Sequence, residues 1–266
     1  MNTIRLYLHS MRMLLKCQLE YPVSFFLQAL AQLVMEGGEM MAVILIIDRF
    51  DRLNQWETGD LFFFFGIMSV TFYLTECFGR GLTGNFPSLI RTGQLDTLLT
   101  RPRGVLTQIL CSAVDPRRIT CIAVGTAALV IGCRLSHVQW TLPKAAAFAE
   151  AILFGCMLIL ALFMIEAIFM IYSVKSVELV NALSYGGRSA CEYPIDIYPR
   201  PLRILFTAVA PFALVLHVPS AYILEKPLYG WPSWTAFVCP LAGAVFFGLI
   251  YVVFRKAMTH YRSTGS

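Results

Sequence analysis

The sequence predicts an all-α polytopic membrane protein, with six transmembrane helices and both termini in the cytoplasm. Hydrophobic residues make up 58% of the 266 residues and charged residues 14%, and the mean hydropathy is +0.68. A soluble domain carries about 25% charged residues. Six apolar runs have about the length that a hydrocarbon core of roughly 30 Å requires. Lysine and arginine gather in alternate connecting segments, which is the pattern of cytoplasmic loops.

An amphipathic N-terminal helix is expected over residues 1–21, either as an anchor on the inner headgroups or as an elbow that passes motion to the first span. The transmembrane domain then covers residues 22–254, and a cytoplasmic tail covers 255–266. The predicted spans are 22–47, 61–79, 119–133, 145–172, 202–224 and 236–254. The third has only 15 residues, so we expect it to extend by a turn.

Charge placement supports this topology. The inner segments, which include residues 173–201, hold 16 of the 21 lysines and arginines, and the outer loops hold five. The net charge of +5 therefore indicates contact with anionic lipid of the inner leaflet. No basic motif for nucleic acid is visible, so membrane lipid is an expected partner and nucleic acid is not.

Motifs for chemistry are missing from the sequence. It has no GxxxxGK[ST] loop for ATP, no HExxH and no GxSxG, and therefore predicts no catalytic residue and no ATPase activity of its own. The eight cysteines form no CxxC pair and the four histidines are scattered, so neither a metal site nor a disulfide framework is expected.

Acidic residues inside the predicted spans need an explanation, because each costs about 2.5–3.5 kcal/mol if it faces lipid. Glu36 and Glu39 lie on one helix face, beside Gly37 and Gly38 in the first span, and Glu166 lies in the fourth. Two interpretations stay open. The carboxyl groups are protonated and hydrogen-bonded inside the bundle, or they line a translocation pathway or a subunit interface.

The fifth span contains two helix-breaking residues, Pro211 and Pro219. We expect both prolines to break that span. The segment Glu225–Trp234 that follows is rich in proline, glycine and aromatic residues and is expected to form a re-entrant or capping element at the outer face.

The loop at residues 86–102 predicts a short helix on the cytoplasmic side. Leu95, Leu98 and Leu99 form an apolar face at helical spacing, and Pro102 would end the helix. A soluble partner could bind such a helix; the alternative is a helix that packs on lipid.

Two stretches resemble signatures of the bacterial ABC-2 type permeases. Residues 91–102, RTGQLDTLLTRP, are similar to the pattern (I/R)xGxLDxLLxRP, and residues 198–224 are similar to the pattern YPxxLRxxFTxxxPxAFxxxxPAxxLL. The second stretch departs from its pattern at Leu214 and Ser220. The resemblance covers essentially the whole chain.

The resemblance implies a permease subunit of an ATP-binding cassette exporter in the bacterial cell membrane, paired with a second permease subunit, identical or related. A separate cytoplasmic P-loop ATPase would bind ATP and Mg, and this chain would bind no cofactor. By position, the residues that contact the ATPase are Arg91, Gly93, Leu95, Asp96, Leu98, Leu99, Arg101 and Pro102.

Two alternatives from other classes remain. A proton-coupled secondary transporter would use Glu36, Glu39 or Glu166, and it would work without ATP. An integral membrane enzyme acting on lipid would need a catalytic constellation, and the sequence offers none. No residue pattern in the sequence favours a drug, a peptide or a lipid as the substrate.

Overall fold

The protein is described by a computed structural model over residues 12–13, 16, 20–50, 55–172, 177–228 and 230–261, with side chains at 46–50 and 177–180 not described. The predicted amphipathic helix of residues 1–21 lies almost entirely outside these ranges, as does the end of the predicted tail. Over the described residues the chain is helical and contains no β-strand, which confirms the all-α fold class.

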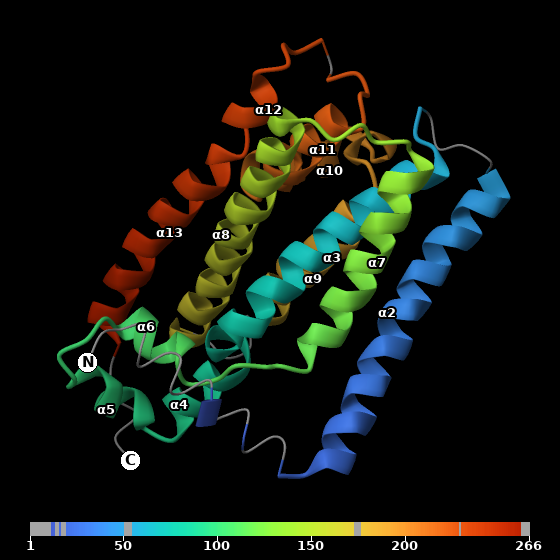
Figure 1. Ribbon diagram of the computed structural model, residues 1–266. Coiled ribbons are helices and arrows are strands. Elements are labelled where there is room, and N and C mark those ends of the chain that lie inside the picture. The colour runs from blue at the N-terminus through green and yellow to red at the C-terminus, as the bar shows by residue number, and fades with distance from the viewer. Residues whose placement is uncertain are drawn as a thin grey trace.

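Six long helices run alongside one another in a bundle (Figure 1). They are α2 (Pro22–Phe50), α3 (Thr58–Arg80), α7 (Arg118–Leu135), α8 (Leu142–Tyr172), α9 (Val177–Cys191) and α13 (Leu241–His260). Short helices occupy the two ends of the bundle. The α5 end carries η1 (Gly81–Asn85), α4 (Phe86–Arg91), α5 (Gln94–Leu99) and α6 (Val105–Leu110).

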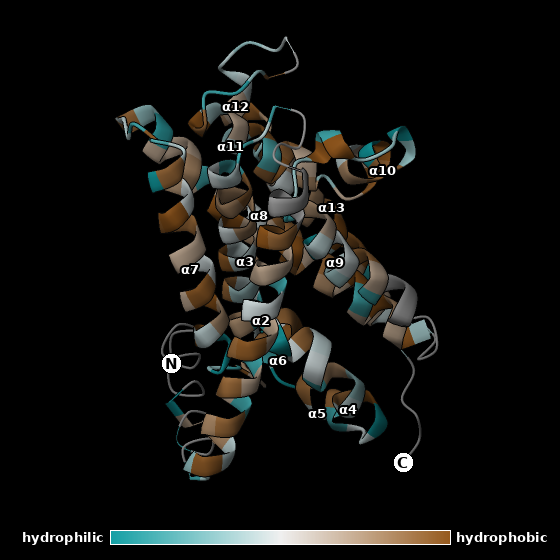
Figure 2. Cartoon of the chain, turned by 90° about the vertical axis from the view of Figure 1, so that its right-hand side faces the viewer, coloured by the Kyte–Doolittle hydropathy of each residue, from teal (hydrophilic) through white to brown (hydrophobic). Residues whose placement is uncertain are grey.

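The opposite end, which we name the α12 end, carries the remaining short helices. They are η3 (Ile195–Ile197), α10 (Arg200–Ile204), η4 (Leu205–Val209), η5 (Ala213–His217), α11 (Val218–Ile223) and α12 (Thr235–Val238). Figure 2 shows apolar residues over the outward surfaces of the long helices. Large apolar side chains are exposed there, among them Val34 on α2, Ile131 on α7 and Val252 on α13. Such a surface suits contact with hydrocarbon.

The helix α3 forms the centre of the bundle. Its consecutive phenylalanines Phe63, Phe64 and Phe65 are all buried, although they point to different sides of the helix, because neighbouring helices surround it. Its closest neighbour is α7: a Cβ added at Gly66 would lie 2.6 Å from the Leu129 backbone nitrogen. Close backbone approach of this kind supplies the van der Waals contact that drives helix association in lipid.

Among the described residues, four helices are long and apolar enough to cross a membrane: Thr58–Arg91, Arg118–Leu135, Leu142–Tyr172 and Thr235–His260. They correspond to the second, third, fourth and sixth predicted spans, and the third has the extra turn that we expected. The first predicted span lies on α2, which has 29 residues. The count of six spans remains a prediction. The four candidate membrane helices become five if a bent helix pair is counted as one span.

That bent pair lies on the predicted fifth span. Residues 202–224 do not form one crossing helix, because Arg200–Val209 and Ala213–Ile223 meet at 85°. Both flanks of this segment contact the start of α3: Gln55 donates a hydrogen bond to Asp196 at 3.4 Å, and Lys226 lies 3.0 Å from Asp60. The segment therefore leaves and returns at the α12 end. The chain crosses the bundle earlier, along α9, where we expected a cytoplasmic loop.

The two prolines lie at different kinds of position. Pro211 lies at the bend, where the preceding Ala210 has the extended backbone (φ −120°, ψ 92°) that a following proline favours. Pro219 is the second residue of α11, which follows the π-helix η5 directly, and the helical segment Ala213–Ile223 continues through it. The bend is therefore at Pro211, and Pro219 does not break its helix.

Candidate functional site

A helical hairpin at the α5 end continues directly from α3. The π-helix η1 joins α3 to α4, and Gly93, with a left-handed φ of 68°, turns the chain from α4 into α5. We name α4 and α5 together the α4–α5 hairpin, residues 86–99. The helix α5 ends at Leu99, three residues before Pro102, close to the expected position.

The predicted ATPase-contact residues divide by exposure. Leu95 is fully buried and holds α5 against the bundle. Gln108 of α6 fixes the exit of the hairpin, because its side-chain amide donates to the Leu98 carbonyl at 3.0 Å and to the Arg103 carbonyl at 3.1 Å. Three of the predicted residues are partly exposed: Gly93, Asp96 and Leu98. The other four are exposed: Arg91, Leu99, Arg101 and Pro102.

Asp96 has a partner inside the chain. It lies beside Tyr261, where burial, together with the charge and hydrogen bond of Asp96, raises the pKa of the Tyr261 hydroxyl. The hairpin is thereby tied to the end of α13. A cavity of about 700 Å³ separates the hairpin from α6, with Leu89, Leu98 and Ser112 among its lining residues.

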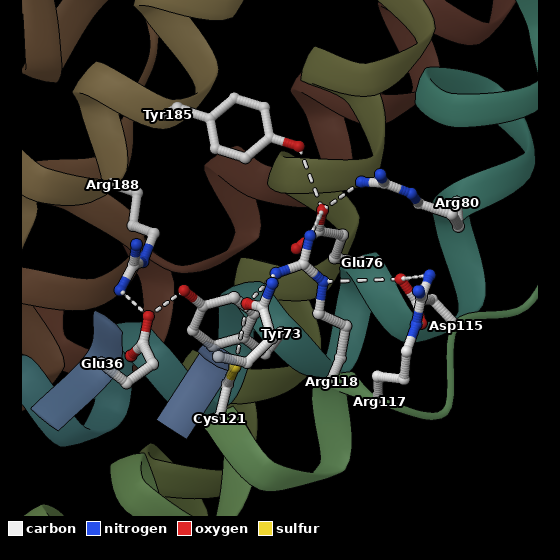
Figure 3. Close-up of polar contacts among 11 residues, drawn as sticks. Glu36, Tyr73, Glu76, Arg80, Asp115, Arg117, Arg118, Cys121, Tyr185 and Arg188 are labelled. Carbon is white, nitrogen blue, oxygen red and sulfur yellow. Dashed lines mark hydrogen bonds and ion pairs between the residues drawn. The ribbon is translucent and has the colours of Figure 1, made fainter. Parts of the chain in front are cut away.

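A buried charge network lies between α2, α3, α7 and α9 (Figure 3). Its first centre is Glu76 of α3, whose side chain is 0% exposed. One carboxylate oxygen of Glu76 lies 2.6 Å from Arg80 and 2.8 Å from Arg118, and it accepts a hydrogen bond from Tyr185 of α9 at 3.0 Å. Three helices thus meet at one carboxylate, and a charge buried in this way requires such partners.

Asp115 extends this centre to the turn that precedes α7. Its carboxylate lies 2.6 Å from Arg117 and 3.8 Å from Arg118. Burial alone would raise the pKa of Asp115, but the hydrogen bonds and charges of Arg117 and Arg118 outweigh burial and hold the pKa below its usual value. Arg117 and Arg118 also donate to Gln28 and Gln32 of α2, which attaches that helix to α7.

The second centre of the network is Arg188 of α9. Its guanidinium lies 2.9 Å from Glu36, 2.6 Å from Glu39 and 3.0 Å from Glu192. Tyr73 of α3 donates a hydrogen bond to Glu36, and the Arg188 guanidinium lies 4.7 Å from the centre of the Tyr73 ring. Three carboxyl groups around one cation leave an excess of acid, so this centre can hold a proton.

The structure brings Glu36 and Glu39 together on Arg188, as expected for residues on one helix face. Glu166 lies apart from them: its carboxylate faces the side-chain amide of Asn181, whose nitrogen can donate at 3.2 Å. Gly37 and Gly38 are exposed, and a Cβ added at either would meet no atom within 4 Å. They leave room on that side of α2 and do not line the charge network.

Sequence reasoning missed Tyr73, Glu76, Arg118 and Arg188 as members of one network. The cost of an acid inside a span could have pointed to a nearby cation. Arg188 was not selected because its segment was assigned to a loop. Over the described residues no group of three or more His, Cys, Asp or Glu side chains could hold a metal ion.

Comparison with known proteins identifies the family. The family model described as "ABC-2 family transporter protein" matches residues 33–265. No match was found among the curated proteins or among the solved structures. The match covers both the α4–α5 hairpin and the charge network, and the apolar helices agree with it. The chain is a multi-pass membrane protein, the permease component of an ABC transporter, and it belongs to the ABC-2 family.

Proposed function

We propose that this permease exports its substrate as a dimer, with an identical or related chain, and that a separate cytoplasmic P-loop ATPase drives it through the α4–α5 hairpin. ATP and Mg would bind to that ATPase, and this chain would bind no cofactor. In this proposal the α5 end faces the cytoplasm, together with both termini.

The continuity of the hairpin with α3 carries the proposal. Helix α3 passes through η1 into α4 without a loop, so a force on α5 is transmitted to the central helix of the bundle. A Cβ at Gly81 would lie 1.9 Å from the Ile109 carbonyl oxygen, which shows that η1 and α6 are in direct backbone contact. A displaced hairpin therefore displaces α3 and α6 together.

The charge network gives that motion a path to α2 and α9. Glu76 belongs to α3 and binds Arg118 of α7 and Tyr185 of α9. Tyr73, one turn earlier on α3, binds Glu36 of α2. Ion pairs and hydrogen bonds of this kind have discrete alternative partners, so they suit a rearrangement between two states. We assign Glu36, Glu39 and Glu166 to the translocation pathway or its walls.

The exposed face of α2 supports the dimer. Val34 is 63% exposed and Met35 66%, and a Cβ added at the neighbouring Gly37 or Gly38 would meet no atom within 4 Å. Small residues next to apolar ones allow a second helix to approach closely in a membrane. We propose that the partner permease packs on this face.

Co-purification tests the ATPase contact. The double variant Leu99→Asp/Arg101→Glu alters two exposed positions beside buried Leu95, so the fold is expected to persist, whereas Leu95→Asp would place a charge in the core. We expect the purified wild type to retain a P-loop ATPase and the double variant to lose it. The matched control Leu142→Asp, at a position 86% exposed at the α12 end, should retain the ATPase. Retention by the double variant would contradict the proposal.

The excess of acid around Arg188 favours one competing function, proton-coupled transport. Vesicles that contain this chain alone distinguish the two. We expect no transport under a pH gradient without ATPase and ATP. Transport by the chain alone, abolished by Glu36→Gln, would replace the ABC mechanism with a proton-driven one.

A further inference from the structure

Two hollows lie side by side along α6 and α13. The lower one, nearer the α5 end, has a volume of about 500 Å³ and is lined by Leu99, Arg103–Leu106, Tyr251, Phe254, Arg255, Met258 and Thr259. The upper one has about 480 Å³ and is lined by residues of α3, α6, α8 and α13. Both volumes fall within the range of about 300–1,000 Å³ that is typical of ligand sites.

The two hollows are neighbours along the same two helices. Helix α6 contributes Leu106 to the lower hollow and Leu110 to the upper one, and α13 contributes Tyr251 and Phe247 in the same way. Residues four apart lie on one helix face, one turn from each other. The Tyr251 and Phe247 rings are stacked, with centroids 6.2 Å apart and an interplanar angle of 9°. We name the combined feature the α6–α13 groove.

The two parts of the groove differ in chemistry. The upper part is almost wholly apolar and is lined by side chains such as Leu110, Leu153 and Phe247. The lower part carries the guanidinium groups of Arg103 and Arg255 and no acidic lining residue. In the part of the chain that the structure describes, neither arginine forms an ion pair.

The groove lies where membrane lipid would contact the protein. Leu249 and Val252 of α13 are 62% and 65% exposed, so the outer surface of this helix suits contact with hydrocarbon. Arg255 lies in the last turns of the apolar helix Thr235–His260, where long basic side chains reach the headgroup region. The groove therefore opens toward acyl chains along its upper part and toward headgroups at its lower end.

We propose that the α6–α13 groove binds one anionic phospholipid. Its phosphate would contact Arg103 and Arg255, since guanidinium groups bind phosphate oxygens in pairs, and an acyl chain would lie along Leu110 and Phe247. The observation behind this goes beyond the permease function: two cations that form no ion pair with any described residue lie at the mouth of an apolar groove at headgroup depth. A lipid bound there bridges the exit of the α4–α5 hairpin to α13, and so limits how far the hairpin can move.

Native mass spectrometry of the purified full chain, titrated with phosphatidylglycerol or phosphatidylethanolamine, tests the proposal. We expect preferential binding of phosphatidylglycerol. The double variant Arg103→Gln/Arg255→Gln should weaken that binding about 30-fold, since each cation contributes on the order of a tenfold factor or less near a lipid surface. Arg103→Lys/Arg255→Lys, which keeps the charge, should retain most of it. Inorganic phosphate at the same concentration should not compete, because it cannot fill the apolar part.

The matched control is Arg134→Gln/Arg200→Gln, which removes the same charge from two exposed arginines away from the groove. Equal loss of binding in this control would overturn the proposal, because net charge alone would then explain the effect. Equal affinity for the two lipids, or full competition by inorganic phosphate, would also overturn it. The unfolding temperature of each variant without added lipid separates a lost site from a lost fold.

Discussion

Arg188 compensates the charge of three carboxylates in the buried network. It is 5% exposed and lies within 3.0 Å of three carboxylates, two of them buried. The flat guanidinium can donate to several acceptors and also stack on the Tyr73 ring. A residue of this kind keeps α9 and α2 in register with α3, because α2 contributes Glu36 and Glu39 and α3 contributes the Tyr73 ring.

Removal of the Arg188 charge should therefore destabilise the protein strongly. We expect Arg188→Gln to lose about 3–5 kcal/mol, the usual cost of leaving buried partners unpaired, and Arg188→Lys to lose less. Thermal unfolding in detergent measures the difference. Adding Glu36→Gln to Arg188→Gln should restore part of the loss, since one uncompensated acid is then removed. An Arg188→Gln protein as stable as wild type would show that the network adds nothing to stability.

Asp115 provides a test of the network by pH. Its pKa is lowered in the folded protein, so its contribution to stability is present above the unfolded value of about 3.9 and is lost as pH falls through the folded value. We expect Asp115→Asn to be less stable than wild type by about 1–2 kcal/mol at neutral pH. The difference should shrink below about pH 5 and continue to shrink as the pH falls through the lowered pKa of Asp115. Unfolding midpoints of both proteins across this range measure it, and a constant difference would contradict the assignment.

At the scale of elements, the contact between α3 and α7 depends on glycines spaced seven residues apart. They are Gly59 and Gly66 on α3, and Gly125 and Gly132 on α7, and an added Cβ at each would meet an atom of the other helix or of the turn after α7 within 2.8 Å. The seven-residue spacing keeps the glycines on one face of each helix, so the two backbones touch along their length. The sequence lacks pairs at GxxxG spacing, and this longer spacing replaces them.

A matched pair of substitutions tests this contact. Gly132→Ala would bring a methyl group to 2.5 Å from the Phe63 backbone nitrogen, and backbone cannot easily move away. We expect a loss of about 1–3 kcal/mol. Gly248→Ala on α13 meets nothing within 4 Å and should be neutral or stabilising by about 0.5–1 kcal/mol. If both variants unfold at the same temperature, the close approach of α3 and α7 does not limit stability.

Hydropathy and motif could predict the elements that are apolar throughout or marked by local signals. The positions of α5 and α13, and the shared face of Glu36 and Glu39, follow from such local patterns. Helix α9 could not be found in this way because it is short and carries polar residues such as Asn181 and Arg188. It forms because α2 and α3 supply acids and aromatic rings for Arg188, more than 100 positions earlier in the chain. Contacts over such sequence distances leave no periodic signal.

At the scale of the whole molecule, the two ends of the bundle are built differently. The α5 end holds the hairpin, while at the α12 end two ion pairs fix the segment after α11. Lys226 lies 3.0 Å from Asp60 at the start of α3, and Lys144 at the start of α8 lies 2.7 Å from Glu225. The hydrogen bond and charge of Lys144 lower the pKa of Glu225, so this link persists at neutral pH. Helix α3 connects the hairpin at one end to this closure at the other.

This arrangement makes a sharp prediction about topology. The sequence alone placed Arg200 in the cytoplasm, at the entrance of a fifth span. In the structure α9 crosses first, so α10, which begins at Arg200, lies at the α12 end, and α5, which contains Thr97, lies at the opposite end (Figure 1). Ser233 precedes α12 by two residues. All three side chains are exposed. Single cysteines at these positions, in a chain whose native cysteines are replaced by alanine or serine, can be labelled in intact cells with a maleimide that does not cross the membrane.

We expect Ser233→Cys and Arg200→Cys to be labelled from outside, and Thr97→Cys only after the membrane is permeabilised. Labelling of Ser233→Cys but not of Arg200→Cys would place a crossing between residues 200 and 233, and would restore the span over 202–224 in place of α9. Labelling of Thr97→Cys from outside would show that the whole molecule has the opposite orientation in the membrane. That outcome would remove the hairpin from the reach of a cytoplasmic ATPase, so this experiment tests the orientation on which the proposed mechanism depends.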